Sequence, residues 1–246
     1  MNIYFCHIWK TGGLSLQEVL KESFGEDACY NILPFVADND KYKQSKDKIV
    51  YGHSLYSLKS IMEESIIYTI LREPVSRIIL YWKHIVREDQ KTLLRPLYNK
   101  NLEVILSSSL FINFCCNLQT KILGLDIDFS LFFTENKNSK LTLGVLGKLY
   151  DNMLWRDVFF VPCTEKIYQK AKKRLDKMSY GIFEFYDSEV KQFLHSIGVE
   201  KKILPYINKG ENQNTIFDSK EAKEMLYSMN EYDVRLYNYA KKRKGL

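Results

Sequence analysis

Residues 5–20 read FCHIWKTGGLSLQEVL, and this stretch decides the fold that we expect. The run 3–8 is short and almost continuously apolar, which is typical of a strand buried on both faces of a sheet. Residues 14–24 then repeat apolar side chains at helical spacing, and Gly25 follows as a signal for the helix end. A strand that ends in a tight glycine turn and continues as a helix is typical of proteins that hold an anionic group.

The composition is that of a soluble globular protein. The chain has 246 residues, of which 46% are hydrophobic and 27% are charged, and its net charge at pH 7 is +6. This charge suits an anionic cofactor or substrate, but it is too small to indicate a nucleic-acid-binding protein. The sequence contains no repeats, low-complexity tracts or linker, so we expect a single domain over residues 1–246.

The five cysteines follow no spacing that is typical of metal ligands. Cys115 and Cys116 lie in an apolar stretch, where buried free thiols are expected, and free thiols indicate a reducing compartment. The first strand already begins at residue 3, and no apolar run reaches the roughly 18 residues of a membrane helix. We therefore expect neither a signal peptide nor a membrane span, and a cytoplasmic protein.

The first 90 residues or so alternate between strand and helix patterns. Further strands are expected at 48–53 and 65–72, with a helix over 54–64 between them. A helix over 74–88 follows, and it opens with a proline, which suits the first position of a helix. This order predicts a parallel sheet covered by helices.

The rest of the chain is expected to be mainly helical, with two more strands at 155–162 and 180–186. The expected helical segments are 93–150 (interrupted by a polar loop at 134–140), 164–178, 187–197, a helix that opens with Asp218 and Glu221 as a capping box, and 231–243. The predicted class is therefore α/β: a P-loop-like parallel sheet flanked by helices, with a mainly helical middle and C-terminus.

The turn after the first strand has the residue types of an anion site. Gly12 and Gly13 would expose the amides of the following helix. Thr11 and Ser15 add hydroxyl groups, and Lys10 adds a flexible positive charge. An ordinary turn with a solvated lysine is the alternative, but this combination favours an anion site. The usual nucleotide phosphate loop does not fit, because its lysine follows the glycines.

Arg72 ends the strand expected at 65–72. An ATP-binding enzyme of the phosphate-loop class would need an aspartate after a later strand to hold Mg²⁺. An arginine at this edge of the sheet instead suits a second anionic group and a metal-free site. The ligand that we predict is a nucleotide with phosphate at two separate places.

Three segments resemble motifs of the sulfotransferases that use 3′-phosphoadenosine 5′-phosphosulfate (PAPS). HIWKTGGLSL (7–16) resembles their 5′-phosphosulfate loop, and YTILREPVSRIILYW (68–82) resembles their 3′-phosphate segment. VYGHSLYSL (50–58) is similar to the Gly-His segment of the carbohydrate sulfotransferases of the heparan-sulfate 2-O type, in the sulfotransferase family 2 group. NLQTKILG (117–124) and YDVRLYNYA (232–240) resemble the same family more loosely.

The resemblance implies a PAPS donor, a 3′,5′-adenosine bisphosphate product and a metal-independent in-line transfer to a carbohydrate or glycan hydroxyl. Lys10 would stabilise the leaving phosphate, Arg72 would bind the 3′-phosphate, and His53 would be the general base for the acceptor hydroxyl. The 5′ end of the donor would lie in a cradle of five residues: Thr11, Gly12, Gly13, Leu14 and Ser15.

The sequence departs from the family pattern at three positions. Trp9 stands where the family usually has proline, and it is expected either to stack on a sugar or to pack in the core. Leu14 stands in place of threonine or serine, which removes a hydroxyl group from the cradle. Leu80 replaces the serine eight residues after Arg72, and Ser76, one helical turn earlier, is the candidate to substitute for it.

Two neighbouring residues have structural interpretations. His7 is expected to pack within the first strand, and Arg77 is expected on the helix surface or in support of the site from behind.

Two other functions remain open at this point. One is an ATP-dependent P-loop-like kinase, which would need Mg²⁺-dependent ATP binding. The other is a non-catalytic nucleotide- or anion-binding module, which the missing hydroxyl groups at Leu14 and Leu80 favour. Intact Lys10 and His53 favour the enzyme. We therefore expect a PAPS-dependent sulfotransferase that acts on a carbohydrate or other hydroxyl acceptor, without a nucleic-acid partner.

Overall fold

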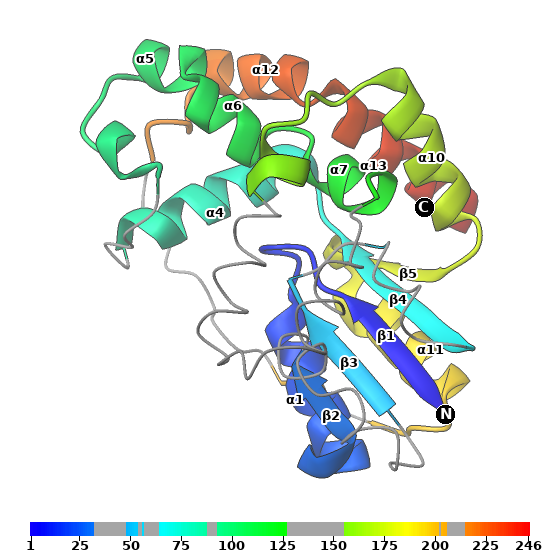
Figure 1. Ribbon diagram of the computed structural model, residues 1–246. Coiled ribbons are helices and arrows are strands. Elements are labelled where there is room, and N and C mark those ends of the chain that lie inside the picture. The colour runs from blue at the N-terminus through cyan, green and yellow to red at the C-terminus, as the bar shows by residue number, and fades with distance from the viewer. Residues whose placement is uncertain are drawn as a thin grey trace, which may run out of the picture.

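The computed structural model describes residues 1–31, 48–53, 56, 64–87, 93–126, 155–201, 203–205 and 215–246. Its centre is a parallel sheet of five strands in the order β2-β3-β1-β4-β5 (Figure 1). The strands are β1 (Asn2–Cys6), β2 (Cys29–Asn31), β3 (Lys48–Gly52), β4 (Ser65–Leu71) and β5 (Ser179–Ile182). Helices flank this sheet, so the predicted α/β class is confirmed.

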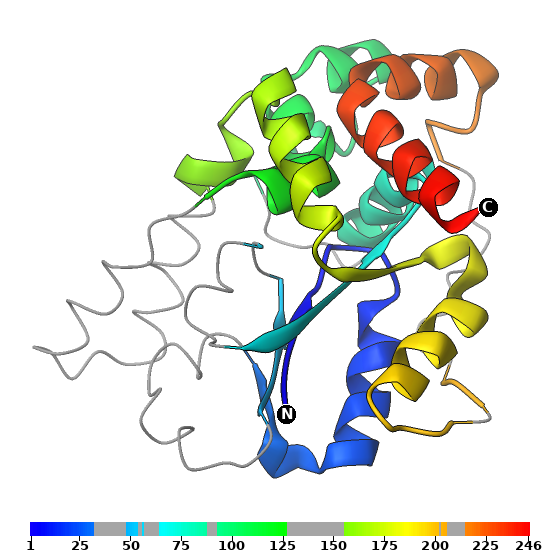
Figure 2. The ribbon, with the colours of Figure 1, turned by 90° about the vertical axis from the view of Figure 1, so that its right-hand side faces the viewer.

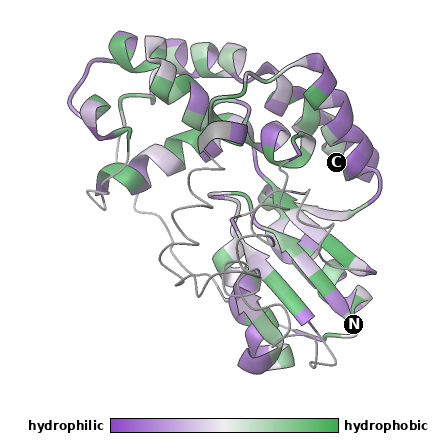
Figure 3. Cartoon of the chain, viewed as in Figure 1, coloured by the Kyte–Doolittle hydropathy of each residue, from purple (hydrophilic) through white to green (hydrophobic). Residues whose placement is uncertain are grey.

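Strand β1 lies at the middle of the sheet, between β3 and β4. Its last residue, Cys6, is opposite Gly52 of β3 and Thr69 of β4. Alternate residues of β1 contribute to two separate hydrophobic clusters, one on each face of the sheet. The prediction of a strand buried on both faces is therefore confirmed. Figure 3 shows hydrophobic residues, in green, along the central strands.

Two helices cover one face of the sheet, as the side view shows (Figure 2). They are α1 (Gly13–Phe24) and α11 (Tyr186–Ser196). Both contribute side chains to the cluster that contains Ile3 and Phe5 of β1. Helix α1 ends as predicted: Gly25 has a φ of 86°, and its N–H donates to the Lys21 carbonyl over an N–O distance of 2.8 Å.

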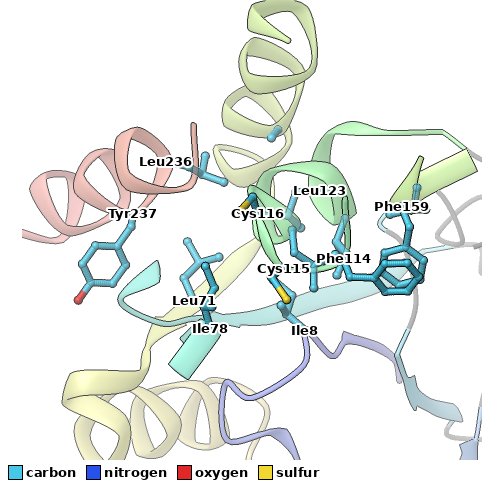
Figure 4. Close-up of a cluster of buried hydrophobic side chains, with 14 of the residues drawn as sticks. Ile8, Leu71, Ile78, Phe114, Cys115, Cys116, Leu123, Phe159, Leu236 and Tyr237 are labelled. Atoms are coloured by element: carbon cyan, nitrogen blue, oxygen red, sulfur yellow. The ribbon is translucent and has the colours of Figure 1, made fainter. Parts of the chain in front are cut away.

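A larger helical layer lies at the carboxyl end of the sheet and supplies the second cluster (Figure 1). Its helices are α4 (Pro74–Arg87), α5 (Leu102–Ser107), α6 (Ser109–Cys115), α7 (Leu118–Gly124), α10 (Glu165–Leu175), α12 (Lys220–Met229) and α13 (Glu231–Lys244). Ile8 and Leu71, at the ends of β1 and β4, pack in this cluster with Leu123 of α7 and Leu236 of α13 (Figure 4). The carboxyl edge of the sheet is thus fixed against α7 and α13.

Short helical turns also occur in the part of the chain that the structure describes: the 3-10 helices η1 (Glu26–Ala28), η3 (Arg95–Leu97) and η5 (Phe183–Phe185), and the π-helical turn η4 (Trp155–Phe159). The strand expected at 155–162 was therefore wrong. Its apolar side chains are used for packing instead, since Phe159 is buried and stacks on Phe114 with ring centroids 4.3 Å apart. A short apolar run fits a buried helical turn as well as a strand.

Other boundaries differ from the sequence prediction in detail. Helix α12 begins one residue later than expected, because Ser219, and not Asp218, caps it by accepting the N–H of Ala222. The three-residue strand β2 was not expected, because so short a segment gives no alternating pattern. The helix expected over 54–64 and the loop at 134–140 lie wholly or mostly outside the described residues.

Arg77 is fully buried, whereas a position on the helix surface was one of the expectations. Its Nη2 donates to the Cys115 carbonyl of α6, and α12 and α13 also pack against α4. Cys115 and Cys116 are buried free thiols, as predicted. Within the described ranges, no helix combines the length and the apolar character that crossing a membrane requires.

Candidate anion-binding and transfer site

The predicted site residues come together at the carboxyl edge of three adjacent strands. Lys10 follows β1, His53 follows β3, and Arg72 follows β4. Because β1 pairs with both of the other strands, these three residues start from neighbouring positions of the sheet. The carboxyl edge is where open parallel sheets bind their ligands.

The backbone of the loop between β1 and α1 is compatible with the predicted anion cradle. Lys10 has a φ of 65° and Gly12 a φ of 84°, so both adopt the left-handed conformation, which is rare for a lysine. Among the described residues, no side chain caps the start of α1, and its first turn has no acidic residue. The amides of this turn lie at the positive end of the helix dipole, where an anion is stabilised.

The side chains of the cradle differ in what they can offer to an anion. The Thr11 hydroxyl is buried and donates its proton to the Ile8 carbonyl, with an O–O distance of 2.9 Å. Thr11 therefore does not supply the hydroxyl donor that we predicted, and its contribution is limited to its main chain. Ser15 is also buried. Leu14 is 48% exposed, so an apolar side chain lies at the mouth of the cradle.

His7 packs beneath the loop, as predicted, and is 4% exposed. Its Nδ1 lies 3.1 Å from Nε2 of Gln17, an amide N–H donor on α1, so the imidazole proton is on Nε2. Burial lowers the pKa of His7 well below its usual value, and the nearby His53 and Lys10 act in the same direction. His7 is thus a neutral side chain that connects β1 to the start of α1.

Gly13 is required by this contact and not by its backbone conformation. A Cβ at residue 13 would overlap the His7 imidazole. We expect Gly13→Ala to lower the free energy of unfolding by about 1–3 kcal/mol through overpacking. In a His7→Ala background the ring is gone, so the same change should cost much less. Urea unfolding of the four proteins measures this, and an equal loss in both backgrounds would contradict the contact.

His53 is held in a defined orientation next to His7. Its Nδ1 lies 3.2 Å from the His7 carbonyl, to which it donates, so the lone pair of the neutral ring is on Nε2. The centroids of the two imidazole rings are 4.3 Å apart. Burial lowers the pKa of His53 to about 4. The hydrogen bond to the His7 carbonyl raises this pKa, and the positive charge of Lys10 lowers it further. The ring is therefore neutral at pH 7.

Trp9 covers one face of His53. The two rings are stacked, with centroids 4.4 Å apart and planes 9° apart, and Trp9 also contacts Phe159 at a centroid distance of 6.0 Å. The expectation that Trp9 packs against the core is confirmed, and its stacking on a sugar stays a prediction. In the described contacts, Trp9 thus shields one face of the imidazole.

Arg72 links the two predicted anion subsites. Its Nη1 donates to the Lys10 carbonyl across 3.2 Å, and its guanidinium carbon lies 3.8 Å from the ring centroid of Phe183. Its Nε is buried and has no hydrogen-bond partner among the described residues. Burial lowers the pKa of Arg72 to about 10, while the Glu184 and Glu73 carboxylates raise it. Arg72 is therefore charged at pH 7 and has a donor left for a ligand.

The start of α4 offers less to a phosphate than the sequence predicted. The Glu73 carboxylate accepts the N–H groups of Val75 and Ser76, at 3.1 and 2.7 Å. The Ser76 amide is thus already used, and only its hydroxyl remains as a candidate ligand. Leu80, where the family has serine, is half-buried.

Sequence reasoning missed the residues that support Arg72 from β5 and α7. Phe183 and Glu184 follow β5, and the Glu184 carboxylate accepts the Glu73 N–H and the Tyr237 hydroxyl, at 3.0 and 2.8 Å. Both residues lay inside the strand expected at 180–186, which in the structure ends at Ile182, so the sequence boundary hid their place at the ligand-binding edge of the sheet. Gln119 also contacts Arg72, and it lies in a segment that only loosely resembled the family.

Comparison with known proteins finds a likeness among solved structures. No protein-family model matches the sequence, and a search of curated proteins finds no match. Among solved structures, the chain is similar to a sulfotransferase from Alicyclobacillus acidocaldarius, with a TM-score of 0.50 and 14% sequence identity. The match covers 97% of this chain and 94% of that protein. Over nearly its whole length, the chain therefore has the fold of a sulfotransferase.

Proposed function

We propose that this protein transfers a sulfuryl group from PAPS to a hydroxyl group of a carbohydrate or glycan. One observation carries the proposal: the Arg72 guanidinium donates a hydrogen bond to the Lys10 carbonyl. This bond holds Arg72, Lys10 and the start of α1 in one site beside His53. The sulfotransferase fold supports the same conclusion.

The residues fit a donor with anionic groups at two places. The start of α1 and Lys10 form one anion subsite, which suits the 5′-phosphosulfate. Arg72 forms the second, which suits the 3′-phosphate, because its buried Nε lacks a hydrogen-bond partner among the described residues. Phe183, which lies over the guanidinium, encloses this second subsite.

The chemistry needs a base at one end of the transferred group and a cation at the other. His53 Nε2 takes the proton of the acceptor hydroxyl while the acceptor oxygen forms its bond to sulfur. The bond between sulfur and the 5′-phosphate oxygen breaks, and Lys10 with the α1 amides stabilises the charge on that oxygen. PAPS supplies the sulfuryl group already attached to this phosphate leaving group.

A non-catalytic module that binds the same nucleotide is the second candidate. The exposed Leu14 in the cradle and the Glu73 carboxylate on the Ser76 amide both weaken the donor site relative to the family pattern. The intact pairing of Lys10 with Arg72, next to an oriented imidazole, favours the enzyme.

Calorimetric titration without metal tests the donor assignment. We expect 3′,5′-adenosine bisphosphate to bind more tightly than adenosine 5′-monophosphate, because Arg72 recognises the additional phosphate. Arg72→Ala should remove about 1.5–3 kcal/mol from the bisphosphate affinity, which is the contribution of a hydrogen bond to a charged group, and should weaken the monophosphate less, through the lost bond to the Lys10 carbonyl.

Arg95→Ala, which removes an exposed arginine from η3, is the matched control. Binding of ATP with Mg²⁺, without binding of the bisphosphate, would replace the proposal by the kinase. Bisphosphate binding without turnover of PAPS across a panel of sugars would favour the non-catalytic module.

A further inference from the structure

Helices α7 and α13 begin side by side and cap each other (Figure 1). The side-chain oxygen of Asn117, just before α7, accepts the N–H groups of Tyr232 and Asp233, at 3.0 and 3.1 Å. In return, the buried Asp233 carboxylate accepts the N–H groups of Gln119 and Thr120, at 3.2 and 2.7 Å. Each helix start is thus satisfied by a side chain of the other.

Further hydrogen bonds around Asn117 strengthen this contact between α7 and α13. Asn117 adopts a φ of 52°. Its main-chain N–H donates to Oδ1 of Asn230, and its side-chain Nδ2 donates to the Met229 carbonyl. The two segments that loosely resembled the sulfotransferases, 117–124 and 232–240, therefore form one rigid unit. The proposed chemistry assigns no role to this unit.

The Gln119 side chain connects the start of α7 to Arg72 by two hydrogen bonds. Its Oε1 accepts the Arg72 N–H at 3.0 Å, and its Nε2 donates to the Arg72 carbonyl at 2.9 Å. The Gln119 side chain thus pairs with the main chain of Arg72 as a neighbouring strand would. Gln119 is 1% exposed, so water cannot readily replace either bond.

Arg72 needs this support because it lies beyond the regular part of the sheet. The pairing of β4 with β1 ends at Thr69, and the pairing with β5 ends at Leu71. Without Gln119, both main-chain groups of Arg72 would lose these partners and the residue could move. Any such movement would shift the guanidinium relative to the Lys10 carbonyl and to Phe183.

We propose that Gln119 is a positioning residue, which aims Arg72 at the 3′-phosphate of the donor. This inference rests on the proposed function. Asp233 fixes the start of α7, Gln119 fixes the Arg72 main chain, and the Arg72 guanidinium then binds the 3′-phosphate while it holds the Lys10 carbonyl.

The test compares two nucleotides on Gln119→Met, which keeps the side-chain length and removes both hydrogen bonds. Dissociation constants of 3′,5′-adenosine bisphosphate and adenosine 5′-monophosphate are measured by calorimetry. We expect the preference of the wild type for the bisphosphate to fall at least tenfold, and the monophosphate affinity to change less than threefold. Gln192→Met, on the exposed side of α11, is the control and should keep the wild-type preference.

A merely structural role would give a different result. It would lower the folded fraction and weaken the binding of both nucleotides equally. An unchanged preference of Gln119→Met for the bisphosphate therefore overturns the inference. If that variant does not fold, Gln119→Leu replaces it: it also removes both hydrogen bonds, adds no charge and must meet the same tenfold criterion. A wild type without preference for the bisphosphate would instead overturn the proposed function, which separates the two failures.

Discussion

Lys10→Met is expected to lower the rate of sulfuryl transfer by about 10²–10³-fold, which is the usual cost of removing one preorganised donor from a site of developing charge. The lysine follows β1 in a left-handed backbone conformation, and the Arg72 guanidinium bonds to its carbonyl. Its main chain is therefore fixed by contacts that do not involve the ammonium group. Methionine keeps most of the side-chain volume, so the substitution should mainly remove the stabilisation of charge on the leaving phosphate.

The measurement is the release of 3′,5′-adenosine bisphosphate from PAPS in the presence of a panel of sugars. Most of the loss should be in kcat, because charge on the leaving oxygen develops in the transition state. Lys166→Met, on the exposed face of α10, serves as the control and should retain the wild-type rate. A Lys10 variant with wild-type kcat would show that the cradle does not hold the leaving group.

His53→Asn is expected to lower kcat by about 10²–10⁴-fold, the range for loss of a general base. The asparagine amide can still donate to the His7 carbonyl, as His53 Nδ1 does, but it offers no basic nitrogen at the position of Nε2. Nucleotide binding should be unchanged, since the proposed donor contacts come from other residues. An equal loss of bisphosphate affinity in calorimetry would place His53 in the donor site instead.

The pKa of His53 gives this second prediction a pH dependence. Because burial lowers the pKa to about 4 in the folded protein, the imidazole should remain neutral from pH 8 down to about pH 5. NMR titration of the ring, assigned with His53→Asn, should give a midpoint well below the ordinary 6.5 or so. Trp9→Ala removes the stacked indole and admits water, so the midpoint should rise, whereas Trp9→Phe should keep it low.

The same shift also affects stability, and its sign follows from proton binding. Between about pH 6.5 and pH 4 the unfolded chain protonates this histidine and the folded chain does not. The unfolded state binds more protons there, so the free energy of unfolding falls as the pH is lowered through this range. His53→Asn should reduce that pH dependence.

The sequence was sufficient to predict the three central strands and to place Lys10, His53 and Arg72 at their carboxyl edge, because both follow from local patterns. Apolar runs mark β1, β3 and β4, and the carboxyl ends of parallel strands meet at one edge. That rule brings Lys10, His53 and Arg72 together without any knowledge of their contacts. The assignment of these residues to steps of the reaction remains a prediction.

The contacts that orient these side chains could not be predicted, since they join residues far apart in the chain. Gln119 reaches Arg72, and Asp233 reaches Gln119, through packing of α7 and α13 that no local pattern encodes. The direction of the Thr11 hydroxyl was missed for a similar reason: a nearby carbonyl competes for its proton, and the residue type alone does not reveal this.

The reciprocal capping of α7 and α13 also bears on how the protein is made. The glycine loop precedes Asp233 of α13 by most of the chain described, so it leaves the ribosome well before that residue. Since chains emerge from their N-terminus, a nascent chain would carry an immature arginine subsite until α13 docks. The arginine subsite would therefore be completed by Asp233, a residue to which the proposed function assigns no contact with the donor.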